Sequence, residues 1–151
     1  MRKGFTLIEL LVVISIVGIL MAVSVFGLQE ARKDSRDARR KADLELIRSG
    51  LEIYHSDCGN YPNDTYTTNW PATLNGDDTP TSCSSSNQYF VSPSEPISTT
   101  GRFYRYYSET GASYSLCAAL EDELTGIDCD GDGGIDSCGT DVECNYKVTS
   151  P

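Results

Sequence analysis

The chain has 151 residues and a formal net charge of −10, with 22 acidic residues against 12 basic ones. This length allows one compact domain, and the excess of negative charge argues against nucleic-acid binding. One His, one Trp and two Met leave little material for a histidine-based enzyme or a histidine metal cage. The composition therefore excludes a large enzyme and allows a membrane-anchored module.

Charge and cysteine are unevenly distributed. Residues 1–56 carry nine Lys or Arg and seven Asp or Glu, whereas residues 57–151 carry three and fifteen. Every cysteine lies in this acidic part, namely Cys58, Cys83, Cys117, Cys129, Cys138 and Cys144. An even number confined to a small polar segment predicts up to three disulfides formed in an oxidising compartment, and fifteen pairings stay open.

The first predicted element is an apolar helix. Residues 10–28 are 19 consecutive uncharged residues, which matches the roughly 20 needed to span a bilayer. An ordinary cleaved signal peptide has a shorter apolar run, so we expect this segment to stay in the mature protein. The basic residues that follow it favour a cytoplasmic C-terminal part. The cysteines favour an external one, which is the orientation we expect.

Glu9 is the one charged residue in the apolar run that starts at Phe5. A carboxylate at the centre of a bilayer costs about 2.5–3.5 kcal/mol on insertion scales. Glu9 therefore either lies at the depth of the lipid headgroups or has a cationic partner.

Residues 3–14, Lys-Gly-Phe-Thr-Leu-Ile-Glu-Leu-Leu-Val-Val-Ile, resemble the prepilin motif of type IV pilins and type II secretion pseudopilins. The resemblance implies that a prepilin peptidase cuts after Gly4 and methylates the new N-terminus at Phe5. It also implies that Glu9 neutralises the N-terminal amine of a neighbouring subunit, and that the leader lies inside and the head outside.

Helical signals continue beyond the apolar run. Apolar residues recur at i, i+3, i+7 and i+10, and we call this set the helix stripe: Leu44, Ile47, Leu51 and Tyr54. This spacing and the lack of proline before Pro62 predict a helix over residues 5–56 that packs on another element. Residues 42–62 are similar to the end of the long helix and the following turn in major pseudopilins. The resemblance therefore covers residues 1–62.

Basic residues cluster at positions 32–41. We favour a solvated helix face with ion pairs, because acidic residues are interspersed with the basic ones. The alternatives are contact with anionic lipid headgroups and, least favoured, contact with DNA.

The predicted head contains a small sheet. Residues 63–100 are rich in Ser, Thr, Asn, Asp and Pro and predict a long irregular connection that Cys83 ties down. Residues 102–107 and 114–119 predict two strands of a hairpin, and residues 143–148 a third strand. Such a sheet would cover the helix stripe, giving an α+β, pilin-like fold with a long helix on a small antiparallel sheet.

Residues 128–136, Asp-Cys-Asp-Gly-Asp-Gly-Gly-Ile-Asp, form what we call the acidic loop. Its carboxylates occur at positions 1, 3, 5 and 9 of an EF-hand-like calcium loop, and they are Asp128, Asp130, Asp132 and Asp136. Residues 121–143 contain no Lys or Arg, so we expect the loop to repel itself without a bound cation.

We therefore predict structural Ca²⁺ on the acidic loop, although position 12 is Gly139 and not glutamate. Asp141, Glu143 or water would supply the last ligand. Metal-bridged C-terminal loops also occur in the major pseudopilins that this chain resembles. The alternative is a solvated acidic turn held by disulfides.

The sequence thus predicts four parts: a leader (1–4), a membrane and filament-core helix (5–28), its amphipathic continuation (29–56) and a disulfide-rich head (57–151). We expect a structural subunit of a type IV pilus-like filament. We do not expect an enzyme, because no Ser/His/Asp or Cys/His set can be assembled. The alternatives are the major pseudopilin of a type II secretion system and a membrane-tethered calcium-binding adhesin.

The expected partners are copies of the same chain, a prepilin peptidase, an inner-membrane assembly platform and, before assembly, the lipid bilayer. The resemblance implies that the chain lies in a bacterial inner membrane before assembly. It then implies a cell-surface or periplasmic filament.

Overall fold

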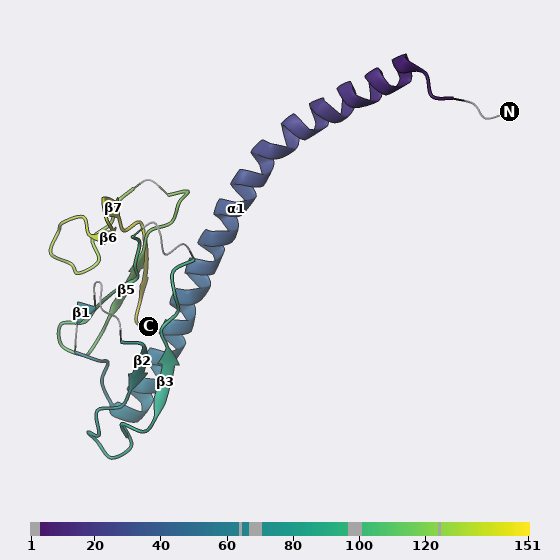
Figure 1. Cartoon of the computed structure of the whole chain (residues 1–151). Helices are drawn as coiled ribbons and strands as arrows, with labels where there is room; N and C mark the ends of the chain where they lie inside the picture. The colour runs from purple at the N-terminus through teal and green to yellow at the C-terminus, as the bar shows by residue number, and fades with distance from the viewer. Residues whose placement is uncertain (1–3, 64, 67–70, 97–100, 124) are drawn as a thin grey trace. The chain divides into compact units, whose positions relative to one another are not determined.

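The computed structural model describes residues 4–63, 65–66, 71–96, 101–123 and 125–151. The helix α1 (Leu7–Cys58) precedes a series of short strands (Figure 1). The strands are β1 (Thr65–Tyr66), β2 (Thr73–Asn75), β3 (Gln88–Val91), β4 (Arg105–Tyr107), β5 (Ser115–Ala118), β6 (Ser137–Gly139), β7 (Val142–Glu143) and β8 (Tyr146–Thr149). The chain divides into two compact units, Met1–Ser35 and Arg36–Pro151, and each is described by itself.

The two ends of α1 carry a recognisable start signal and a recognisable stop signal. Thr6 precedes the helix, and its hydroxyl accepts a hydrogen bond from the Glu9 amide at 3.3 Å, as N-cap residues do. At the other end Gly59 has φ of 80°, and its amide donates to the carbonyl of His55 at 2.8 Å. A glycine in this left-handed conformation is a common helix terminator. The prediction of a helix over residues 5–56 is therefore confirmed to within two residues at each end.

The helix stripe lies in the core of the second unit, since each of its members is at most 4% exposed. It belongs to one buried cluster with Tyr104, Tyr106, Leu116 and Val148, which come from the sheet and the segment leading into it. The sheet has the antiparallel order β1-β4-β5-β8. Burying the apolar faces of a helix and a sheet against each other is the main driving force of such a layer. The predicted α+β architecture is confirmed.

The predicted hairpin is also present. Strands β4 and β5 pair with Arg105 opposite Cys117 and Tyr107 opposite Ser115. In the connection, Gly111 has φ of 73°, and its amide donates to the hydroxyl of Ser108 at 3.2 Å. The third strand, β8, begins three residues later than predicted and pairs with β5.

The prediction that residues 63–100 are wholly irregular is wrong. Strands β2 and β3 pair antiparallel, with Leu74 opposite Phe90, and both of these side chains are buried. A Cβ atom on Gly50 of α1 would lie 2.5 Å from the Cδ1 atom of Phe90. This hairpin thus buries two side chains and approaches α1 closely at Phe90, although its segment is rich in turn residues.

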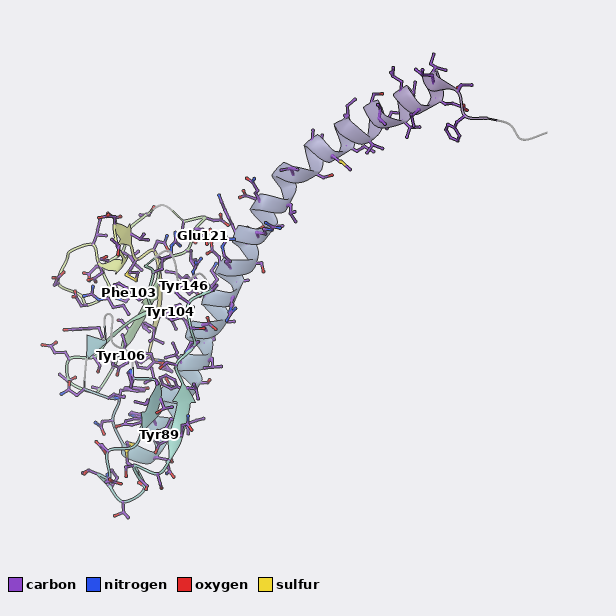
Figure 2. The ribbon with its side chains drawn as sticks, viewed as in Figure 1. Tyr89, Phe103, Tyr104, Tyr106, Glu121 and Tyr146 are labelled. Atoms are coloured by element: carbon purple, nitrogen blue, oxygen red, sulfur yellow. A yellow bond between two sulfur atoms is a disulfide. The ribbon has the colours of Figure 1, made fainter. Side chains whose placement is uncertain are left out.

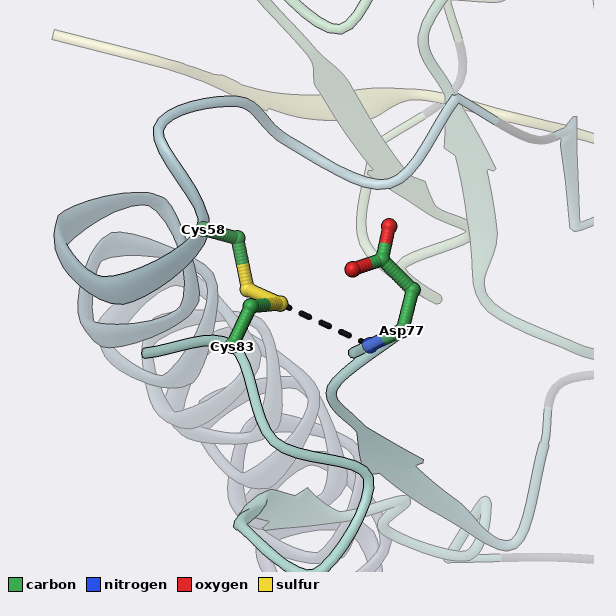
Figure 3. Close-up of side chains that lie close together, drawn as sticks. All are labelled: Cys58, Asp77 and Cys83. Atoms are coloured by element: carbon green, nitrogen blue, oxygen red, sulfur yellow. Dashed lines mark hydrogen bonds between the residues drawn. A yellow bond between two sulfur atoms is a disulfide. The ribbon is translucent and has the colours of Figure 1, made fainter. Parts of the chain in front are cut away.

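All six cysteines form disulfides, which confirms the prediction, and the pairs are Cys58–Cys83, Cys117–Cys129 and Cys138–Cys144. Four of them form a second buried cluster with Ala119. Sulfur thus supplies part of the core that apolar side chains would supply in a larger domain. Figure 3 shows the Asp77 amide donating to the Cys83 sulfur at 3.5 Å. Because the sulfurs of Cys58 and Cys83 are joined in a disulfide, the group formed by Cys58, Asp77 and Cys83 does not offer thiolates to a metal.

Candidate functional site

The first candidate site is the start of α1. Besides the Thr6 cap, the Glu9 carboxylate accepts hydrogen bonds from the Thr6 amide at 3.1 Å and from the Thr6 hydroxyl at 2.9 Å. This reciprocal arrangement is a capping box. Within one chain, therefore, Glu9 stabilises the N-terminus of its own helix, and sequence analysis missed this role although Thr-x-x-Glu is its signature.

The segment that follows is apolar on every side. The large side chains that the structure describes in this segment are exposed, from Phe5 at 82% and Leu7 at 82% to Leu28 at 54%. The hydroxyls of Ser15 and Ser24 donate to the carbonyls of Val12 and Leu20, so these polar groups are satisfied inside the helix. By length and composition α1 is long and apolar enough to cross a membrane. Water is a poor solvent for such a surface, which lipid or other apolar helices would cover.

The second candidate site is the acidic loop between β5 and β6. Asp128, Asp130 and Asp136 each place a carboxylate oxygen within 4.8 Å of the others. Asp132 is not in this group, and its Oδ1 accepts a hydrogen bond from the Gly134 amide at 2.7 Å. Three of the four predicted ligands are therefore brought together.

The proposed last ligands lie elsewhere. Asp141 and Glu143 line a hollow of about 300 Å³ together with Glu123 and Asn145. The hollow does not include the three clustered carboxylates. The acidic loop therefore differs from an EF-hand in its last ligand as well as in lacking flanking helices.

Backbone amides satisfy much of the acidic loop. Asp128 accepts hydrogen bonds from the amides of Gly131 and Gly133, and these lower the pKa of its carboxyl group because they favour the charged form. Asp136 accepts at Oδ2 from the amides of Cys129 at 2.6 Å and Asp130 at 3.2 Å.

A cation from β4 reaches the same loop. The guanidinium of Arg105 lies 2.6 Å from Asp136 Oδ1 and 3.2 Å from Asp130 Oδ2. Residues 121–143 do contain no Lys or Arg, but a positive charge reaches their carboxylates from a strand outside this range. Alternation along β4 carries the signal that could have found it. Tyr106 is buried in the core with the helix stripe, so its neighbour Arg105 points to the opposite face of the sheet.

These contacts limit how well the loop fits a calcium ion. Carboxylate oxygens are the ligands that calcium prefers, but it takes six to eight of them at roughly 2.3–2.6 Å. The guanidinium of Arg105 is bonded to two of the three clustered carboxylates, and an ion on the same oxygens would meet it. The donor set does not fit calcium while Arg105 keeps this position, and calcium binding stays a prediction.

A third cluster fixes α1 to the head within the second unit. Arg40 is fully buried, and its guanidinium bonds to Asp37 Oδ1 at 2.6 Å, Glu95 Oε1 at 2.6 Å and Glu121 Oε1 at 3.0 Å. Arg36 also donates two hydrogen bonds to the Glu121 carboxylate, which reaches α1 from the segment after β5 (Figure 2). The interpretation of positions 32–41 as a solvated face is wrong for Arg40.

The charged groups in this cluster alter the pKa of Glu121. Hydrogen bonds from Arg36, and then from Arg40, lower the pKa of the Glu121 carboxyl group from 4.5 to about 2. The Glu121 carboxylate is thus held ionised at neutral pH, with the two arginines as counter-ions.

The family described as "Prokaryotic N-terminal methylation motif" matches residues 1–25. The chain carries a prepilin N-terminus. It is 39% identical over 77 residues to the fimbrial protein EcpC of Eikenella corrodens, which covers 50% of this chain and 49% of the relative. It is 43% identical over 72 residues to the type IV wide pilus major component PilA4 of Thermus thermophilus, covering 48% and 51%.

A third relative is the type II secretion system core protein G of Klebsiella michiganensis, 39% identical over 62 residues that cover 40% of this chain and 43% of the relative. The chain thus spans about half the length of the curated relatives that it matches. No solved structure matches it. Gly4, Phe5 and Glu9 all lie inside the region that the family matches, residues 1–25.

Proposed function

We propose that the chain is the structural subunit of a type IV pilus-like filament and that it polymerises through its N-terminal helix. The observation that carries this proposal is the prepilin motif over residues 1–25. It leads into a helical segment with exposed apolar side chains on all sides. Burying that segment among copies of itself would remove a large apolar surface from water or lipid. The names of the relatives, a fimbrial protein and a pilus component, support the same role.

The residues have the following roles in this proposal. A prepilin peptidase cuts after Gly4 and methylates Phe5, and an inner-membrane platform assembles the product. Glu9 then pairs with the Phe5 amine of a neighbouring subunit, which offsets the cost of a carboxylate in apolar surroundings. To do so, its carboxylate exchanges the Thr6 hydrogen bonds of its own capping box for that amine.

We propose that the subunit waits in a bacterial inner membrane with its head outside, and that it then forms a surface or periplasmic filament. The role that we propose is structural, and it uses no catalytic residue. The main alternative is the major pseudopilin of a type II secretion system, which the similarity to core protein G favours. A tethered adhesin explains less, because a mere anchor needs neither the Gly4–Phe5 junction nor Glu9.

The test combines processing and assembly. Expressed with its assembly machinery, the wild-type chain should yield filaments whose subunits start at Phe5 and carry one extra methyl group by intact-protein mass spectrometry. Glu9→Val should be cut and methylated but should fail to enter filaments, whereas the control Glu30→Val changes an acid beyond the apolar run and should assemble. Filaments of Glu9→Val at wild-type yield, or of chains that retain Met1 to Gly4, would contradict the proposal.

A further inference from the structure

We propose that Arg105 is the built-in counter-ion of the acidic loop and that it holds the loop folded without a metal ion. Its guanidinium would then do in this head what calcium does in an EF-hand loop. Since the inference concerns the stability of the head, it is independent of filament assembly.

The contacts of Arg105 fit this role. Its two terminal nitrogens reach two different carboxylates, those of Asp136 at 2.6 Å and Asp130 at 3.2 Å. Its side chain is 16% exposed, and those of Asp130 and Asp136 are 19% and 10% exposed. Hydrogen bonds from a charged guanidinium to carboxylates are stronger than those between neutral groups, and partial shielding from water reduces the screening of this pair by salt.

Other carboxylate oxygens of the loop accept hydrogen bonds from the chain as well. Both oxygens of Asp128 and the second oxygen of Asp136 accept backbone amides. Lys147 donates to the backbone carbonyl of Asp128. Among the described residues, every ion pair to the acidic-loop carboxylates comes from Arg105. The loop thus has both its hydrogen bonds and its positive charge from the chain itself.

The sheet fixes Arg105 where the loop needs it. Arg105 lies directly opposite Cys117 in the β4–β5 register, and directly opposite residues present their side chains on the same face. Cys117 is bonded to Cys129 inside the acidic loop. The loop's covalent anchor and its counter-ion therefore come from one cross-strand pair, which keeps the guanidinium near the carboxylates.

The experiment measures thermal unfolding of the full chain in detergent, followed by near-ultraviolet circular dichroism, with calcium chloride or with EGTA. The wild type should melt at the same temperature in both. Arg105→Gln should melt about 5–10 °C lower, because it leaves Asp130 and Asp136 close together without a cation. The control Arg48→Gln removes a partly exposed arginine paired with Glu45 on α1 and should stay within about 2 °C of the wild type.

A second pair of variants separates the arginine from the ion. Asp136→Asn loses an Arg105 contact and should lower the melting temperature, whereas Asp132→Asn loses none and should hardly change it. Were calcium the counter-ion, the wild type would melt lower in EGTA, and Asp132→Asn would abolish that difference. Either a calcium-dependent wild type or an unchanged Arg105→Gln overturns the inference. If Arg105→Gln does not fold, the aspartate pair decides.

Discussion

Removing Arg40 should destabilise the head more than any surface change, because Arg40 is fully buried among three carboxylates. Arg40→Met keeps the aliphatic stem and deletes the charge. Asp37, Glu95 and Glu121 would then be close together with side chains at most 15% exposed. Breaking a buried ion pair by deleting one partner costs about 3–5 kcal/mol, since the other charge stays buried and uncompensated.

The size of the second unit converts this cost into a melting temperature. With about 2.1 cal/mol/K of unfolding entropy per residue, the unit Arg36–Pro151 loses about 4 °C for each 1 kcal/mol. Arg40→Met should therefore melt about 12–20 °C below the wild type at pH 7. The neighbouring control Arg39→Met changes an exposed arginine and should shift the melting temperature by about 2 °C or less.

The cause of the loss can be tested as well as its size. If the penalty comes from uncompensated carboxylates, adding Glu95→Gln to Arg40→Met should recover part of it, because an amide needs no counter-ion. A melting temperature of Arg40→Met within about 4 °C of the wild type, which corresponds to a loss of only about 1 kcal/mol, would refute the reasoning. So would a double variant less stable than the single one.

Two further predictions concern the same unit. The pKa of Glu121 is lowered from 4.5 to about 2. The stability that its ionised form contributes is thus complete above pH 4.5 and lost as the pH falls towards 2. The melting temperatures of the wild type and of Glu121→Gln, plotted against pH, should converge as the pH falls through this range. A constant difference between them would contradict the assignment of a lowered pKa to Glu121. Gly50→Ala should cost about 1–3 kcal/mol in chemical unfolding by overpacking against Phe90. The control Gly27→Ala meets no atom within 4 Å, and an equal loss there would point to the helix backbone instead.

Local pattern was sufficient for about half of the fold. The 3.6-residue period of the helix stripe and the lack of proline define α1, and alternation with a glycine turn defines β4 and β5. The same period could have placed Arg40 on the buried face, because Arg40 stands four residues before Leu44. Two of its three acidic partners, Glu95 and Glu121, could not be predicted, since they lie 55 and 81 residues away in the sequence.

The candidate site shows the same division. The spacing of the aspartates indicated a turn that gathers carboxylates, and three of them do gather. The sequence pattern could not tell whether a metal or a side chain would neutralise them. That depends on which strand lies beneath the loop, and strand order follows from packing and not from local sequence. The hairpin β2–β3 was missed for a related reason: its burial depends on Leu74 and Phe90 meeting α1.

The pairing of the cysteines bears on how the head is made. The disulfides join the first cysteine of the chain to the second, the third to the fourth and the fifth to the sixth, across separations of 25, 12 and 6 residues. If the head reaches an oxidising compartment with its N-terminal end first, its thiols become available one at a time. The second, fourth and sixth cysteines then each meet their native partner as the one thiol that is still unpaired. Oxidation in the order of emergence then gives the native set directly. This connectivity therefore calls for no reshuffling of wrong bridges when the cysteines oxidise in chain order, and no disulfide loop encloses a cysteine of another pair.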